Sequence, residues 1–232
     1  MSSTPLSMEV LDWLFYLSLV TVVFTPLLLA WNFRRDAREF QVLTFVFLWS
    51  FICDFCADIF YRYKIAFVNL GGTMYGIGAP ILFGFFFFHV LAWRRLRPLI
   101  ISATAVVTSF AVGNALFIQR RQHNTYSGVL LSLYVLAFCV LYYYKLIREL
   151  PAKKIQDTPM FWVISSFFFA HSGKLILSGT ADYMTKFHND NLVVLWSLYN
   201  FLAVLGNLTA AWGAWVHLRH MRQMKSNTVL LQ

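Results

Sequence analysis

Two carboxylates lie within the apolar stretch FLWSFICDFCADIFYRY, residues 47–63. Asp54 and Asp58 are four residues apart, so they share one face of a helix, and Ser50 and Tyr61 extend the same stripe. Two carboxylates placed in this way can pair with a cation, bind a ligand or share a proton, because like charges at close range resist ionising together. This helix face is therefore a candidate site.

A second polar stripe follows in FFFAHSGKLILSGTADYM, residues 167–184, where His171, Lys174 and Ser178 have helical spacing. Lys174 can be the counter-ion of the aspartates, and histidine is the side chain whose ordinary pKa lies nearest neutrality. Farther along, Asn200 and Asn207 are seven residues apart and can supply amide donors and acceptors. The two stripes together offer both charge signs and neutral hydrogen-bonding groups.

The elements that must position these residues are membrane spans. Of the 232 residues, 59% are hydrophobic and 12% charged, against roughly 25% charged in an ordinary soluble domain. Seven apolar runs approach the roughly 20 residues that cross a bilayer. The sequence therefore predicts an all-α, single-domain bundle of seven transmembrane helices, with spans at about 9–31, 41–62, 66–92, 99–118, 127–147, 159–181 and 192–216.

Charged residues inside these spans are expected to face one another. An ionised side chain at the bilayer centre costs about 2.5–3.5 kcal/mol on insertion scales, so Asp54, Asp58 and Lys174 should point into the bundle. Counting about 1.5 Å per residue puts the two charge signs at similar depths. We predict that Lys174 lies within salt-bridge or one-water reach of an aspartate. Two interpretations stay open: a salt bridge that fixes helix register, or a pocket for a ligand or proton.

Basic residues predict the orientation of the chain. Thirteen of the 19 lysines and arginines fall in four segments, 32–40, 93–98, 145–157 and 217–225. These segments follow the first, third, fifth and seventh predicted spans, so they lie on the same side of the membrane. By the positive-inside rule this side is cytoplasmic, which places the N-terminus outside and the C-terminus inside. The net charge of +9 is thus a topological signal, and we expect a bilayer rather than nucleic acid as the partner.

Prolines and glycines predict local departures from regular helices. Pro26 and Pro80 fall within spans, where a missing amide donor favours a kink or local unwinding. Gly72 and Gly76 have the small-xxx-small spacing that lets two membrane helices approach closely.

Other motifs give little support for cofactor chemistry. The CDFC match at 53–56 lies in mid-span, whereas a redox thiolate favours an exposed helix start. His89 lies near the cytoplasmic end of its span and away in depth from His171, which argues against a haem held between the two. We expect no cofactor and no metal ion.

Two stretches resemble a known type of protein. TPMFWVISSFFFAHSG at 158–173 and LWSLYNFLAVLGNLTAAW at 195–212 are similar to the penultimate and last helices of uncharacterised small bacterial seven-helix membrane proteins, which are similar to the membrane input region of some sensor histidine kinases. The resemblance implies a multi-pass protein of the bacterial inner membrane and brings no catalytic motif. Since only about fifteen residues follow the last predicted span, any signal must leave through a separate cytoplasmic or membrane protein partner.

These observations favour a seven-helix receptor or sensor that binds a small ligand or senses protonation. The candidate residues are Asp54, Asp58, His171, Lys174 and Asn200, with Tyr61, Ser178 and Asn207 as a possible extension. The alternative is a proton- or ion-coupled transporter of small solutes with the same residues along its pathway. An intramembrane enzyme is a second alternative, for which no nucleophile and base have recognisable spacing.

Overall fold

The computed structural model describes residues 5–31, 33, 36–63, 70–118, 125–149, 155–187 and 192–229. The side chains of 5–8, 61, 62, 181–187, 192 and 225–229 lie outside the description. Every regular element within the described ranges is helical, so the all-α prediction is confirmed there. The helices are α1 (Pro5–Val22), α2 (Phe24–Ala30), α3 (Arg38–Arg62), α4 (Leu70–Leu91), α5 (Arg97–Gly113), α6 (Thr125–Glu149), α7 (Pro159–Phe187) and α8 (Leu192–Val229).

Two shorter turns complete these elements. A π-helical turn at Asn114–Ile118 continues α5, and a 3-10 turn at Ile155–Asp157 precedes α7. Within the described residues, seven stretches are long and apolar enough to cross a membrane. They agree with the predicted spans to within a few residues, except at the C-terminal end of the seventh span. The stretches are Glu9–Ala30, Arg38–Phe60, Leu70–Leu91, Arg97–Ile118, Thr125–Glu149, Pro159–Thr180 and Val193–Met224.

The outer surface of the bundle is apolar along the helices. On α3, the exposed side chains of Phe45, Leu48, Ile52 and Phe55 recur every three or four residues and form one stripe. A continuous apolar stripe of this kind is unfavourable in water and matches a lipid surface. The chain thus has the construction of a multi-pass membrane protein.

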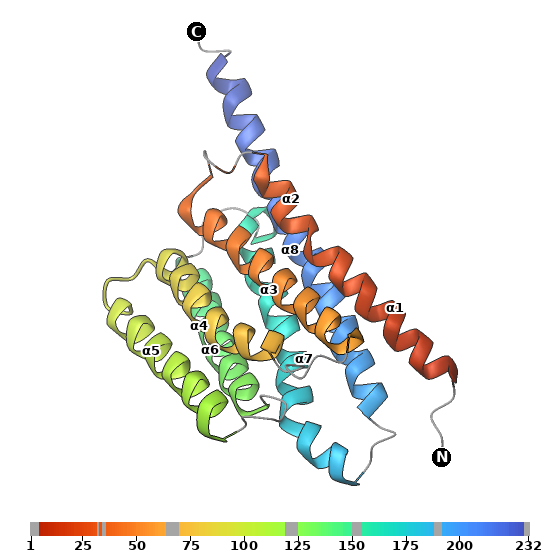
Figure 1. Ribbon diagram of the computed structural model, residues 1–232. Helices are drawn as coiled ribbons and strands as arrows, with labels where there is room; N and C mark the ends of the chain where they lie inside the picture. The colour runs from red at the N-terminus through yellow and green to blue at the C-terminus, as the bar shows by residue number, and fades with distance from the viewer. Residues whose placement is uncertain are drawn as a thin grey trace.

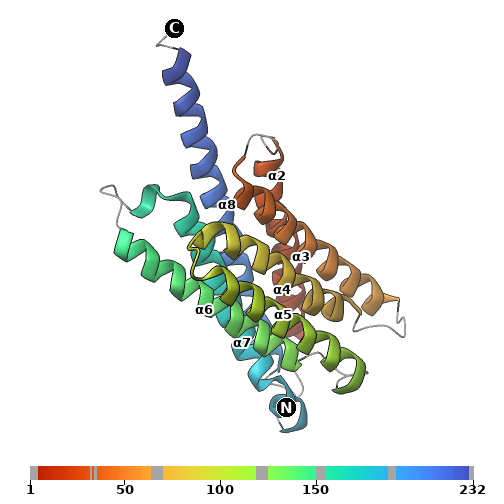
Figure 2. The same cartoon turned by 90° about the vertical axis from the view of Figure 1, so that its left-hand side faces the viewer.

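The helices pack as an elongated bundle with α5 at its edge (Figures 1 and 2). α7 packs against α6 and α8, and α1 lies along α8. α4 contacts α3, α5 and α6. The end where α2, α4 and α6 finish is called the basic end here, after flanking residues such as Arg38 and Arg97, and the other end is called the opposite end.

The first span contains a break that proline explains. α1 ends at Val22 and α2 begins at Phe24, with Val23 between them. Pro26 has no N–H to donate to the carbonyl of Val22, so the regular helical ladder is interrupted at this point. The predicted irregularity at Pro26 is confirmed.

The third span agrees with the prediction only in part. α4 is an unbroken helix through Pro80, so the predicted local unwinding there is wrong, whereas a kink there stays a prediction. Close packing is present through Gly71 and Gly78: a Cβ on Gly71 would lie 2.6 Å from the carbonyl oxygen of Cys53, and one on Gly78 would lie 2.5 Å from the Trp49 ring. A Cβ on Gly72 would meet nothing within 4 Å. These contacts hold α4 close against α3.

The last helix is much longer than its predicted span. α8 has 38 residues and continues past residue 216 to Val229, so it extends beyond the bundle at the basic end (Figure 1). The segment after Gly213 contains no glycine or proline, and its leucine, arginine, methionine, glutamine and lysine residues favour helix. The predicted span of 192–216 is thus the apolar part of a longer helix that ends at Val229.

Candidate functional site: a polar cavity between five helices

A cavity of about 90 Å³ lies between α1, α3, α4, α7 and α8. Each helix presents one face to it, because its lining residues recur at helical spacing: Phe47, Ser50 and Asp54 on α3 are an example. The other lining residues are Ser18, Val22, Val46, Tyr75, Phe83, Ser166, Phe167, Ala170, His171, Lys174, Tyr199, Ala203, Gly206 and Asn207. The two polar stripes of the sequence therefore meet at one place.

Asp54 and Lys174 supply opposite charges to this cavity. The two interact electrostatically, yet no salt bridge joins them although both side chains are described. The ammonium of Lys174 lies instead 3.7 Å from the centre of the Tyr75 ring, over its face. An ammonium in this position is stabilised by the quadrupole of the ring. The predicted direct salt bridge is absent, and contact through one water stays a prediction.

The three ionisable groups of the cavity differ in exposure. Asp54 is exposed although it lines the cavity, so the cavity reaches the surface at this residue. Lys174 is partly buried, and His171 is only 3% exposed. The order from the mouth inward is thus carboxylate, ammonium and imidazole.

His171 has an unusual polar atom. Its Nδ1 is buried and has no hydrogen-bond partner, and the ring packs edge to face against Phe83 at 5.1 Å between centroids. An unpaired buried polar atom costs about 1–3 kcal/mol, so such atoms are uncommon in folded proteins. Because His171 is part of the cavity wall, this nitrogen is a candidate partner for a polar molecule inside.

Two tyrosines complete the polar part of the cavity, and the sequence did not single them out. Tyr75 lies against Ser50, and Tyr199 interacts electrostatically with Asp54 and Tyr75. The sequence around Tyr75 contained an indirect signal, namely the flanking glycines. In the structure, Gly71 and Gly78 bring α4 close to α3 on either side of this tyrosine. Tyr199 directly precedes Asn200 and carried no separate signal.

The remaining predicted site residues lie elsewhere. Asp58 is one turn from Asp54 towards the opposite end and interacts with Asp12 of α1. Asn200 is buried, but it does not line the cavity, whereas Asn207 does and donates to the carbonyl of Ser18 at 3.1 Å.

Ser178 faces another helix. A Cβ placed on Gly128 of α6 would lie 2.8 Å from the Ser178 hydroxyl oxygen, so this side chain points towards α6. The side chain of Tyr61 lies outside the described residues. Of the possible extension, only Asn207 thus reaches the cavity.

An aromatic layer closes the cavity towards the basic end. Its rings pack closely, with centroids 5.0 Å apart for Phe83 and Phe167 and 5.3 Å apart for Phe86 and Phe167. No member is more than 5% exposed. The layer consists of Phe47, Phe83, Phe86, Phe87 and Phe167.

A second hollow, of about 570 Å³, lies at the basic end between α3, α4, α6, α7 and α8. His89 lines it, as its predicted place near this end of the span implies, and its Nδ1–H donates to the carbonyl of Phe85 at 2.8 Å. Lys145 donates to the carbonyls of Val90 and Leu91 at 3.2 and 2.8 Å, and thereby caps the end of α4. These contacts satisfy backbone groups at a helix terminus.

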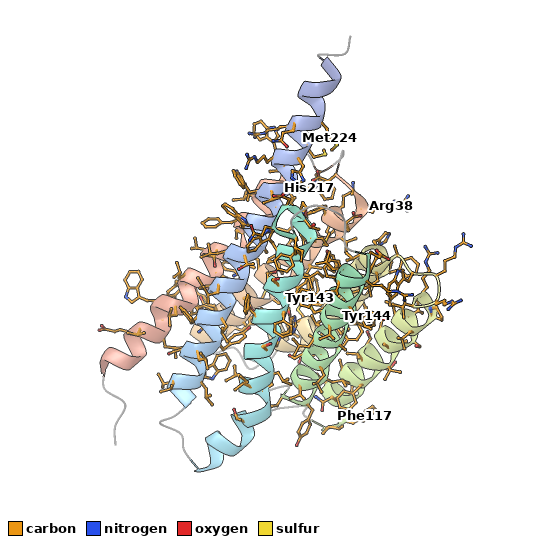
Figure 3. The ribbon with its side chains drawn as sticks, turned by 180° about the vertical axis from the view of Figure 1, so that it is seen from behind. Arg38, Phe117, Tyr143, Tyr144, His217 and Met224 are labelled. Atoms are coloured by element: carbon orange, nitrogen blue, oxygen red, sulfur yellow. The ribbon has the colours of Figure 1, made fainter. Side chains whose placement is uncertain are left out.

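One polar pair at the basic end has no local sequence signal. His217 lies on α8 (Figure 3). It donates from Nε2 to Asp36 Oδ1 at 3.2 Å, and its ring stacks on Phe40 at 3.8 Å between centroids. The Asp36 side chain is fully buried, which raises the pKa of its carboxyl, while the bond from His217 reduces the rise. The pair joins residues 181 positions apart.

Comparisons with protein-family models, curated proteins and solved structures found no match to this chain. The chemistry of the cavity must therefore be argued from its own residues. Among the described side chains, no three histidine, cysteine, aspartate or glutamate residues are grouped to hold a metal ion. The cavity offers one carboxylate, one ammonium, an imidazole nitrogen and several hydroxyls, which together can bind a small polar molecule through hydrogen bonds and charge.

Proposed function

We propose that this chain is a seven-helix membrane receptor whose sensing site is the polar cavity. The observation that carries the proposal is that Asp54 and Lys174 face the same cavity without neutralising each other in a salt bridge. A buried ion pair that only fixes helix register would be expected in direct contact, because desolvation is offset only by good geometry. Charges held apart on a cavity wall suit recognition better than stability.

The aromatic layer favours a receptor over a transporter. A pathway for solutes needs polar groups or an opening on both sides of the binding site. Here the floor is made of packed phenylalanines, and Asn207 of α8, which lines the cavity, donates to Ser18 and Thr21 of α1. This floor favours a cavity that is open to one side only, as a receptor requires.

The orientation follows from the positive-inside rule. The basic end would be cytoplasmic and the opposite end would face the outside of a bacterial inner membrane, so that the mouth at Asp54 receives molecules from outside. α8 contributes Tyr199 and Asn207 to the cavity and continues without a break to Val229. It is thus the element suited to pass a signal to a separate cytoplasmic or membrane protein partner.

The test places a chemical probe in the cavity. Ser50→Cys, in a chain whose three cysteines are replaced by alanine, is reconstituted in oriented vesicles and treated with a charged, membrane-impermeant methanethiosulfonate. Hydrogen exchange is then measured in residues 36–41 and 216–222, which meet through Asp36 and His217. Ser109→Cys on the exposed face of α5 is the matched control, because it does not line the cavity.

A receptor predicts modification of position 50 from the opposite end alone, with a change of exchange at the basic end that the control does not show. Modification of position 50 from both sides of the membrane would overturn the proposal and favour the transporter. Modification without any change at the basic end would leave no transmitted signal and would also overturn it.

A further inference from the structure

The polar cavity has the features of a site for one class of ligand. Its charged and unpaired groups are arranged in order of depth, and its volume sets a size limit. The inference drawn from these features rests on the proposed function, since it names what the receptor would bind. It concerns the same three residues: Asp54, Lys174 and His171.

Net charge is the first constraint. A cation would be attracted to Asp54 and repelled by Lys174, and an anion would experience the reverse. A ligand with both signs satisfies both groups and adds no net charge to a region from which water is largely excluded, where an unpaired charge is costly. The opposite charges that share this cavity therefore select a dipolar molecule.

The order of these groups with depth determines the orientation of a bound ligand. Asp54 is exposed at the mouth, so a cationic group would remain there with its carboxylate partner. Lys174 and the 3% exposed His171 lie farther in, and the ammonium and an imidazole N–H can donate to an anionic group. The unpartnered Nδ1 of His171 is a second, independent indication that a polar group belongs at this depth.

Size narrows the class further. The cavity measures about 90 Å³, whereas an engineered apolar cavity of about 150 Å³ holds benzene, which has six heavy atoms. By the same ratio the present cavity encloses about four heavy atoms, and one or two more can lie in the mouth at Asp54, which makes five or six in all. Ligands of several hundred Å³, the usual size of drug-like molecules, are too large.

We infer that the cavity binds a small zwitterionic amino acid of the size of glycine or alanine, with its ammonium at Asp54 and its carboxylate at Lys174 and His171. The hydroxyls of Tyr75 and Tyr199 lie around the charged groups and supply further donors. No covalent step is involved. Recognition depends on charge separation within the ligand, which distinguishes a zwitterion from either ion alone.

The experiment is calorimetric titration of the purified full-length chain in lipid nanodiscs with five probes at one pH and salt concentration. Glycine and alanine carry both charges, methylammonium and acetate carry one each, and leucine carries both but is too large. We expect saturable binding of glycine or alanine, with at least tenfold weaker binding of the other three. Equal binding of methylammonium or acetate, equal binding of leucine, or no binding of any probe would overturn the inference.

Variants test the assigned groups. Asp54→Asn preserves shape and removes one charge, and we expect at least a tenfold loss of glycine affinity. Tyr199→Phe removes only a hydroxyl, should retain the fold, and is expected to weaken binding by a smaller factor. Glu9→Gln is the matched control, since it makes the same type of change at an exposed carboxylate of α1 away from the cavity. An unchanged affinity in Asp54→Asn, or an equal loss in Glu9→Gln, would contradict the assignment.

The outcome of the binding experiment is independent of the outcome of the thiol-probe experiment on the receptor. Binding is measured on the isolated chain without any readout of signalling, whereas the thiol probe at position 50 tests transmission without any amino acid. If glycine binds and the thiol probe produces no change at the basic end, the receptor proposal fails and the zwitterion site stands. If the thiol probe produces the change and no zwitterion binds, the reverse holds.

Discussion

The two ends of the bundle treat their charged residues differently. At the basic end three charged groups have close partners: Asp36 accepts from His217 through Oδ1, although its Oδ2 is buried without a hydrogen-bond partner, Lys145 donates to two carbonyls, and Glu149 accepts from the Trp93 indole N–H at 3.0 Å. In the polar cavity, Asp54 and Lys174 face each other without a salt bridge. A charged group whose partner is supplied by the fold suggests a structural role, whereas charged groups that line a cavity without pairing suggest recognition.

The largest expected effect concerns the basic end. His217→Phe preserves a ring that can stack on Phe40 but removes the donor to Asp36. Because a fully buried carboxylate then has no partner, we expect the free energy of unfolding to fall by about 3 kcal/mol near neutral pH. Denaturation in mixed micelles measures it.

The double change Asp36→Asn with His217→Phe is the control for this prediction. It removes the charge as well as the donor, so most of the lost stability should return. A single variant as stable as the parent chain would break the contrast between the two ends.

Close packing between α3 and α4, rather than charge pairing, is expected to stabilise the cavity half. Gly71→Ala should cost about 2 kcal/mol, because its Cβ would lie 2.6 Å from the Cys53 carbonyl oxygen, a backbone atom that cannot move aside easily. Gly72→Ala is an almost ideal comparison, since nothing lies within 4 Å, and it should be neutral or slightly stabilising. Equal effects of the two changes in thermal unfolding would show that helix propensity, not packing, decides.

Lys174→Met should have a smaller effect on stability. The contact that would be lost is the one with the Tyr75 ring, which is worth about 1 kcal/mol, whereas a buried salt bridge broken on one side costs about 3–5 kcal/mol. A double-mutant cycle with Tyr75→Leu measures the coupling. A loss near 4 kcal/mol with no coupling to Tyr75 would restore the interpretation of Lys174 as half of a register-fixing ion pair.

The dependence of stability on pH gives the smallest expected signal. Burial raises the pKa of Asp36 above 3.8, and His217 reduces the rise, so the folded state binds this proton more readily than the unfolded state. The resulting stabilisation is complete below pH 3.8 and is lost as the pH rises through the raised pKa. Asp36→Asn should lack this component of the pH profile, and identical profiles for the two proteins would contradict it.

Local patterns predicted much of this architecture. The seven spans follow from apolar run length, and the break near Pro26 follows from one missing amide donor. The meeting of Asp54, His171 and Lys174 follows from spacing and depth, because charged groups cannot face lipid cheaply. These predictions depend on patterns over short sequence separations or on the free-energy cost of placing a charged group in lipid.

What could not be predicted depends on rotation and on distant partners. Asn200 and Asn207 are seven residues apart, yet only Asn207 lines the cavity, because a small rotation of α8 decides which side chain reaches it. The hydrogen bond between Asp36 and His217 joins the segment before α3 to the last helix, and no local sequence pattern predicts a contact between residues so far apart. Tyr75 as the partner of Lys174 required knowing how closely α4 approaches α3.

The length of α8 has a mechanical consequence. From Asn207 at the cavity to Val229 the helix rises about 33 Å, at about 1.5 Å per residue. Treated as a stiff rod that pivots at Asn207, it converts a tilt of about 5° into a sideways movement of about 3 Å at its far tip. A displacement smaller than the width of a water molecule beside Tyr199 is thereby enlarged several-fold outside the bundle, where a neighbouring protein can register it.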